Sequence, residues 1–127
     1  MAKILVVDDE TEICKVLENI LSKEGHEIFT ANNGKEAFRR MYNVSPDLMI
    51  LDIKMPEMDG YEVCERIEKD PFYSDMPILI LSGSIMEDEE KKDIMINKAI
   101  MSKPFEIQDL LNKIEYLLKE NRSKNKE

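Results

Sequence analysis

Ile4-Leu5-Val6-Val7-Asp8-Asp9 joins four apolar residues to two adjacent carboxylates without a break. A short apolar run of this kind is typical of a strand that is buried on both faces of a parallel sheet. The pattern recurs at Leu48-Met49-Ile50-Leu51 and at Ile78-Leu79-Ile80-Leu81. Weaker candidates lie at residues 27–30 and 99–101, where we expect an edge strand and a short last strand. The sequence therefore predicts five strands.

Apolar residues at helical spacing separate these strands. The four stripes are Ile13, Val16, Leu17, Ile20 and Leu21; Ala37, Phe38 and Met41; Val63, Cys64 and Ile67; and Ile107, Leu110, Leu111, Ile114, Leu117 and Leu118. Strands that alternate with helices predict an α/β fold, here a doubly wound five-stranded parallel sheet with right-handed crossovers and helices on both faces. Within residues 84–97, Glu87 to Asp93 form a charged run and Ile94, Met95 and Ile96 are apolar, so we expect at most a short or irregular helix there.

The length of the chain, 127 residues, fits one compact domain. We place this domain at residues 1–120 and expect the polar segment 121–127 to be a disordered tail. There is no apolar stretch of transmembrane length and no signal peptide, so the expected location is cytoplasmic. A formal net charge of −9 repels phosphate backbones and anionic membranes, so we expect no direct binding of nucleic acid or membrane by this domain.

The cysteines and the single histidine carry no sign of metal or catalytic chemistry. Cys14 and Cys64 have neither metal-ligand nor C-x-x-C spacing, and we expect two reduced thiols, with Cys64 packed in the core. His26 lies in the turn signal Gly25-His26-Glu27 without another histidine or a cysteine nearby. We therefore expect His26 to face solvent in a turn.

Polar side chains follow the predicted strands at the point where ligands bind in open α/β sheets, the carboxyl ends of the strands. The first strand ends in Asp8 and Asp9, the third in Asp52 and the fourth in Ser82, and the fifth leads to Lys103. Aspartate is also a common cap and turn residue, which could account for the first two. Asp52 follows four apolar residues directly, so it belongs at the mouth of the core.

If the first and third strands are neighbours, Asp8, Asp9 and Asp52 converge, and their like charges oppose one another. A hard divalent cation removes this conflict, and Mg²⁺ typically shares its ligand shell between carboxylates and a phosphate. Lys103 adds an ammonium and Ser82 a hydroxyl at the same edge. This set suits in-line phosphoryl transfer, with an acyl phosphate on Asp52 as the product.

Four motifs lie in order along the chain: Val6-Val7-Asp8-Asp9-Glu10, Leu51-Asp52-Ile53-Lys54-Met55-Pro56, Asp59-Gly60 and Lys103-Pro104-Phe105. Over almost its whole length the sequence thereby resembles the receiver domain of bacterial response regulators. Each motif alone is weak, whereas all four at compatible spacing are specific. The resemblance implies a flavodoxin-like sheet with strand order 2-1-3-4-5.

The resemblance also implies that Asp52 accepts a phosphoryl group from a phosphohistidine on a sensor histidine kinase or histidine phosphotransfer protein. Mg²⁺, or Mn²⁺ in its place, would be bound by Asp9, Asp52 and the backbone carbonyl of Lys54, with Asp8 acting through water. The output partner stays open, and we expect a monomer or weak dimer.

The resemblance implies roles for four further residues around the phosphate. Lys103 would pair with the phosphoryl oxygens across a cis bond to Pro104, and Ser82 would move toward the phosphate. Lys54 and Ser84 would flank the phosphate and set the lifetime of the acyl phosphate.

Several residues depart from the family pattern. Gly83 follows Ser82 in place of alanine, residues 82–103 span about one residue fewer than usual, and Ile100 replaces the aromatic residue that toggles on activation. A β-branched side chain has few rotamers and no polar tip to exchange between inside and outside. We therefore expect activation to act through residues 82–97.

Two other functions fit this fold class. A metal-dependent phosphohydrolase of the haloacid dehalogenase type would carry a D-x-D arrangement after the first strand, but Asp8-Asp9 is followed by Glu10-Thr11. A receiver fold that only binds partners usually lacks one of the acids or the lysine, and none is lost here.

Overall fold

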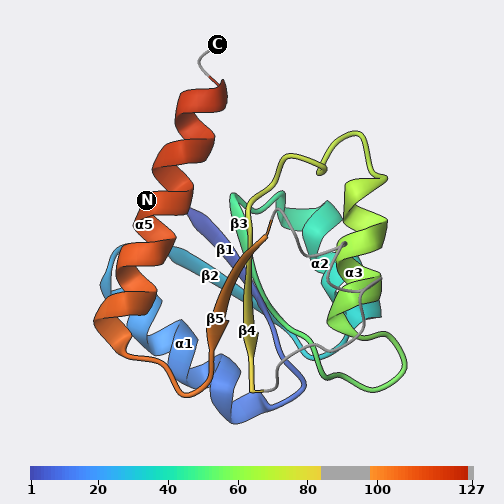
Figure 1. Ribbon diagram of the computed structural model, residues 1–127, viewed down its shortest axis with the longest axis horizontal. Coiled ribbons are helices and arrows are strands. Elements are labelled where there is room, and N and C mark those ends of the chain that lie inside the picture. The colour runs from blue at the N-terminus through green and yellow to red at the C-terminus, as the bar shows by residue number, and fades with distance from the viewer. Residues whose placement is uncertain (84–97, 126–127) are drawn as a thin grey trace.

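The computed structural model describes residues 1–83 and 98–125, with side chains described through residue 121 outside the same gap. Five parallel strands form one sheet in the order β2-β1-β3-β4-β5, with helices on both faces (Figure 1). The predicted fold class and strand order are confirmed. The elements are β1 Lys3–Val7, α1 Thr11–Lys23, β2 Glu27–Ala31, α2 Gly34–Val44, β3 Leu48–Asp52, α3 Gly60–Glu68, β4 Ile78–Ser82, β5 Ala99–Ser102 and α5 Ile107–Asn125.

The sheet separates two apolar cores, because successive side chains of a strand point to opposite faces. Strand β1 contributes Leu5 and Val7 to a core that is covered by α2 and α3. It contributes Ile4 and Val6 to a second core, which is covered by α1 and α5. Figure 1 shows these helix pairs on the two sides of the sheet. Burial on both faces explains why these strands read as continuous apolar runs.

Helix ends coincide with sequence signals. Asn33 begins α2 by accepting a hydrogen bond from the Glu36 amide, and Asp59 begins α3 in the same way with Glu62. Helix α1 is followed by Gly25 at φ +90°, the left-handed conformation that glycine adopts without strain. Asn33 and Asp59 thus mark where the loops that follow β2 and β3 end, whereas Gly25 lies in the turn that leads into β2.

The buried side of α1 differs from the predicted stripe. Its buried residues are Cys14, Leu17 and Leu21, whereas Val16 is 52% exposed. With 3.6 residues per turn, Val16 lies about 100° around the helix from Leu17 and misses the sheet. Both cysteines are unbridged and Cys64 is buried, as expected, and Cys14 is buried as well.

Helix α5 runs to Asn125, past the boundary that we predicted at residue 120. Among the described residues, no helix combines the length and the apolar character needed to cross a membrane. The irregular helix that we expected at residues 84–97 lies outside the described part of the chain.

His26 is not the solvent-facing turn residue that we expected. Its side chain is 6% exposed, and its Nε2 lies 3.6 Å from Oε1 of Glu115 on α5. Its Nδ1 accepts a hydrogen bond of 3.1 Å from the backbone N–H of Ala2. His26 therefore ties the start of β1 and the turn after α1 to the last helix, three segments that are distant in sequence.

We expect His26→Ala to lower the free energy of unfolding by about 1–3 kcal/mol, because it leaves the Ala2 N–H without its acceptor and opens a cavity. Glu115→Ala should cost less than about 0.5 kcal/mol, since its carboxylate is largely exposed and its ion pair is screened. Urea unfolding of the two variants measures this difference. Equal losses would show that the exposed ion pair, rather than the bond to Ala2, holds this corner together.

Candidate phosphoryl and metal site

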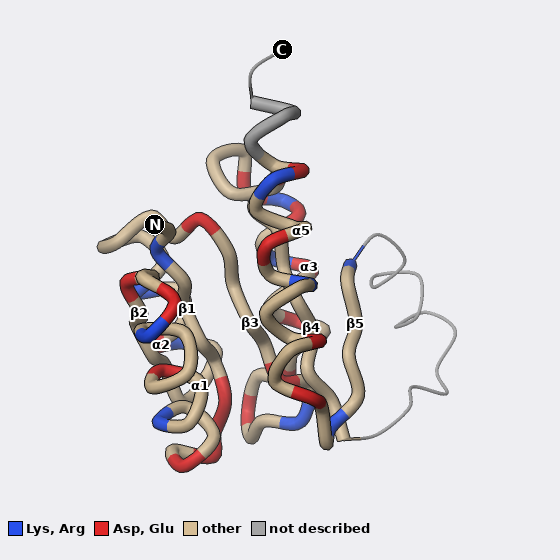
Figure 2. The backbone as a smooth tube through the Cα atoms, turned by 90° about the vertical axis from the view of Figure 1, so that its left-hand side faces the viewer, with Lys and Arg blue, Asp and Glu red and all other residues tan. Residues whose placement is uncertain are grey.

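The register of the sheet brings two predicted site residues side by side. Val7 of β1 is paired with Leu51 of β3, so Asp8, directly after β1, and Asp52, the last residue of β3, lie next to each other at the carboxyl edge. Asp8 is 2% exposed and Asp52 6% exposed. Acidic segments of the backbone gather at the lower edge of Figure 2, where β1 and β3 end. Two carboxylates are thus held at the mouth of the core.

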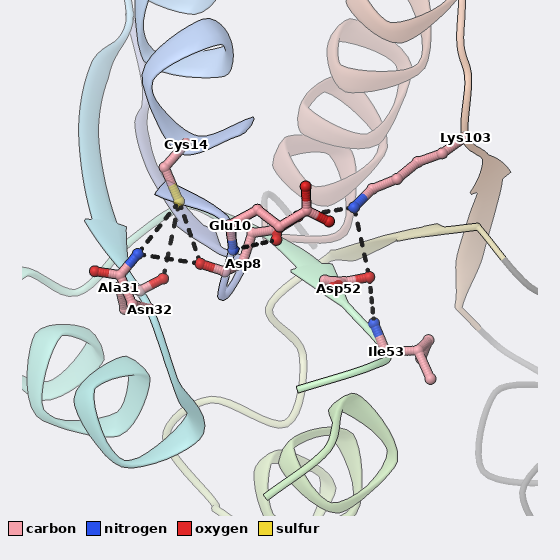
Figure 3. A network of polar contacts seen from close by, with 8 residues as sticks. All are labelled: Asp8, Glu10, Cys14, Ala31, Asn32, Asp52, Ile53 and Lys103. Carbon is pink, nitrogen blue, oxygen red and sulfur yellow. Dashed lines mark hydrogen bonds and ion pairs between the residues drawn. The ribbon is translucent and has the colours of Figure 1, made fainter. Parts of the chain in front are cut away.

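Lys103 extends from the end of β5 to both carboxylates (Figure 3). Its Nζ donates a hydrogen bond of 2.8 Å to Oδ2 of Asp8 and lies 3.6 Å from Oδ1 of Asp52. The Lys103–Pro104 bond is cis, as the resemblance implied. The ammonium group is 95 residues away from Asp8 in sequence, so only the folded sheet brings these charges together.

The charges of this site oppose one another in part. Burial and the neighbouring negative charge of Asp8 raise the pKa of Asp52 above its usual value, although Lys103 opposes the shift. Burial alone would lower the pKa of Lys103, but its hydrogen bond to Asp8 and the charge of Asp52 outweigh this effect and raise it. The lysine thus stays charged, yet one ammonium does not fully compensate the carboxylates that surround it.

The loop after β1 holds a set of oxygen donors that could bind a metal ion. Carboxylate oxygens of Asp8, Asp9 and Glu10 lie within 4.8 Å of one another, and Asp9 and Glu10 are exposed. Clustered carboxylate oxygens are the donors that Mg²⁺ and Mn²⁺ prefer. The buried, incompletely compensated charge of Asp8 and Asp52 also favours a divalent cation. Glu10 belongs to the first of the four sequence motifs, but nothing in the sequence shows that its carboxylate lies beside those of Asp8 and Asp9.

Gly60 lets helix α3 approach the backbone directly after Asp52. A Cβ atom at this position would lie 2.5 Å from the carbonyl oxygen of Asp52 and 2.8 Å from Cα of Ile53. The Gly60 N–H donates a hydrogen bond of 2.8 Å to the Ile53 carbonyl, and the Ile53 N–H donates one of 2.9 Å to Oδ1 of Asp52. The backbone around Asp52 is therefore fixed by direct contact with the first turn of α3.

The other predicted site residues lie at the same edge or outside the described residues. Ser82 is buried at the end of β4, and its carbonyl accepts a hydrogen bond of 2.9 Å from the Lys103 N–H. Lys54 is exposed, two residues beyond Asp52, and its backbone carbonyl stays a predicted ligand. Ile100 is 49% exposed on β5. Ser84 lies outside the described residues, so its influence on acyl-phosphate lifetime stays a prediction.

Two residues of the site were missed by sequence reasoning. Asn32 and Cys14 both contact the backbone carbonyl of Asp8, at 3.2 Å and 3.5 Å (Figure 3). Only their positions could have drawn attention to them: Asn32 is one residue beyond β2, and Cys14 lies on the buried side of α1. Side-chain bonds to a carbonyl leave no pattern of spacing or charge that could reveal them.

Comparison with known sequences identifies one family. The family model for the response regulator receiver domain matches residues 4–115. A relative from Porphyra purpurea, named probable transcriptional regulator ycf27, is 39% identical over 122 residues, which cover 92% of this chain and 47% of the relative. The corresponding protein of Cyanophora paradoxa is 38% identical, with 92% and 48% covered. The chain spans about half the length of these relatives.

Solved structures agree with the sequence comparison. A CheY-like response regulator receiver domain protein from Methanospirillum hungatei superimposes with a TM-score of 0.87 at 31% identity, over 98% of both chains. The chemotaxis protein CheY4 of Vibrio cholerae gives a TM-score of 0.82 at 31% identity, covering 92% of this chain and 98% of that one. The chain therefore belongs to the family of response regulator receiver domains, the regulatory modules of two-component signalling.

Proposed function

We propose that this receiver domain is switched by transfer of a phosphoryl group to Asp52 from a phosphohistidine of a sensor histidine kinase or histidine phosphotransfer protein. The observation that carries the proposal is the convergence of Asp8, Asp52 and Lys103 at one edge of the sheet. Loss of an acid or of the lysine would favour a receiver that only binds partners, and this chain retains all of them. A CheY-like neighbour and regulators of transcription among its relatives fit a switch rather than a hydrolase.

In the proposed step, a carboxylate oxygen of Asp52 attacks the phosphorus atom. The new P–O bond forms as the P–N bond of the phosphohistidine breaks, and the electron pair of that bond goes to the imidazole nitrogen. The hydrogen bond from the Ile53 N–H orients the Asp52 carboxylate for the attack. The Lys103 ammonium, already 3.6 Å from Asp52, neutralises part of the charge on the incoming phosphoryl oxygens.

We propose that Asp9, Asp52 and the backbone carbonyl of Lys54 hold Mg²⁺ or Mn²⁺ directly, with Asp8 acting through water. Glu10, whose carboxylate lies beside those of Asp8 and Asp9, extends this donor set. When bound, the cation supplies charge neutralisation for the phosphoryl oxygens. Asp8 meanwhile keeps Lys103 in place through the 2.8 Å hydrogen bond. In this proposal Asp9 binds the cation directly, whereas Asp8 mainly positions the lysine.

The output surface follows from the connection between Lys103 and Ser82. Because the Lys103 N–H is bonded to the Ser82 carbonyl, movement of either residue is passed to the ends of β4 and β5. We propose that a partner reads the surface of β4 and β5 that extends from Gly83 at this end to the exposed side chain of Ile100 on β5. The predicted switch at residues 82–97 lies largely outside the described residues. The name of the ycf27 relatives suggests control of transcription as the output.

Incubation with acetyl phosphate or phosphoramidate and Mg²⁺ should add the mass of one phosphoryl group, because Asp52 is the buried carboxylate with a raised pKa beside a lysine. Asp52→Asn, or EDTA, should abolish the addition. Asp75→Asn, which removes an exposed acid before β4, is the matched control and should label like the unaltered protein. Intact-protein mass spectrometry reads all arms, and equal labelling of Asp52→Asn would exclude Asp52 as the acceptor.

Replacing Lys103 with Ala should impair switching while sparing cation binding, because the ammonium repels a cation but attracts phosphoryl oxygens. Its Mg²⁺ affinity should equal or exceed that of the unaltered protein, whereas Asp9→Ala should lose most of it. Beryllofluoride, a stand-in for the phosphoryl group, should then shift the amide NMR signals of Ser82 and Gly83 much less than in the unaltered protein. A variant at Lys98, which pairs with Glu68, is the control. The assigned roles are wrong if Lys103→Ala loses Mg²⁺ affinity as completely as Asp9→Ala.

A further inference from the structure

The peptide unit between Asp8 and Asp9 is hydrogen-bonded to side chains that lie outside the loop after β1. Its carbonyl oxygen accepts a hydrogen bond of 3.2 Å from Nδ2 of Asn32 and a weaker one of 3.5 Å from the thiol of Cys14. The N–H of Asp8, one peptide earlier, donates to the Ala31 carbonyl at 3.1 Å. The end of β2 and the residue after it therefore fix the backbone on both sides of Asp8 (Figure 3).

A fixed carbonyl also fixes the residue that follows it. A peptide unit is planar, so the direction of the Asp8 carbonyl sets the direction of the Asp9 N–H and the point from which Asp9 departs. Asp9 is exposed, whereas Asp8 is already held by Lys103 and by the Glu10 N–H. Rotation of this peptide would therefore change the position of Asp9 more than that of the Asp8 carboxylate.

Asn32 itself sits on a rigid support. It lies between the last residue of β2 and Asn33, the N-cap of α2, whose side chain is bonded to the Glu36 amide. Its Nδ2 also lies 3.9 Å from the Cys14 sulfur, so the amide is placed between two elements. Sites supported by packed elements keep their geometry better than sites on free loops.

We propose that Asn32 is a positioning residue for cation binding, which holds the Asp8–Asp9 peptide so that the Asp9 carboxylate is preorganised. This inference rests on the proposed metal-dependent phosphorylation and adds a residue to its machinery. Supporting groups around a metal site raise affinity because the ligands need less ordering on binding. The competing explanation is that Asn32 only satisfies a buried carbonyl, in which case its loss would lower stability but not cation affinity.

The test compares Asn32→Ala with Asn33→Ala, a neighbouring residue of the same type with a purely structural task. Electron paramagnetic resonance of free Mn²⁺ during a titration gives the affinity of each variant, and thermal unfolding gives its stability. Asn32→Ala should bind Mn²⁺ about fivefold more weakly, the effect of one net hydrogen bond. Asn33→Ala should bind within twofold of the unaltered protein, although its melting temperature falls by a few degrees.

A second readout separates positioning from catalysis. Asn32→Ala should require a higher Mg²⁺ concentration for half-maximal labelling by acetyl phosphate, yet approach the rate of the unaltered protein at saturating Mg²⁺. Should Asn32→Ala fail to fold, Asn32→Leu fills the space without a donor and should show the same loss of affinity. Unchanged Mn²⁺ affinity in the Asn32 variant, or an equal loss in Asn33→Ala, would overturn this inference alone. Failure of the unaltered protein to bind Mn²⁺ would instead overturn the proposed function on which it rests.

Discussion

One ammonium group shared by two buried carboxylates is the constraint on which the rest of this structure depends. Lys103 lies 2.8 Å from Asp8 and 3.6 Å from Asp52, and the pKa of Asp52 is still raised. The folded protein therefore holds more negative charge at this edge than its own cation compensates. Such a site gains stability from added positive charge, and this gain is the physical reason why the proposed cation site fits at this edge.

The fold resists this local repulsion because its apolar cores lie directly behind it. Strands β1 and β3 are buried on both faces up to the residue before each acid, so the acids cannot separate without disrupting the sheet. Gly60 adds a second restraint, since α3 packs against the backbone after Asp52 without an intervening side chain. Across the molecule, His26 fixes the start of β1 to α5. Hydrophobic packing thus stabilises the fold, and this stability lets the protein hold uncompensated charge at the carboxyl edge of the sheet.

Features that depend on neighbouring residues could be predicted from the sequence, whereas features that depend on contacts between distant segments could not. The strands and the acids at their ends follow from short-range patterns, and the strand order followed from a family resemblance. The burial of His26 and the contacts of Asn32 join segments that are distant in sequence, so no local pattern predicted them. Val16 was misjudged because apolar spacing does not show where the buried side of a helix ends. The sequence already argued against a hydrolase of the haloacid dehalogenase type, because the D-x-D arrangement is missing. The match to the receiver-domain family agrees with this.

An incompletely compensated carboxylate at Asp52 costs the folded protein stability, and urea unfolding of the unaltered protein and of Asp52→Asn in EDTA tests this constraint most directly. A carboxyl group whose pKa is raised in the folded state contributes stability below its ordinary pKa, and this contribution is lost as the pH rises through the raised pKa. At neutral pH without divalent cations, Asp52→Asn should therefore be the more stable protein. The difference should shrink as the pH falls toward the ordinary pKa of aspartate, and as Mg²⁺ is added to the unaltered protein. A less stable Asp52→Asn under the same neutral, cation-free conditions would contradict the account.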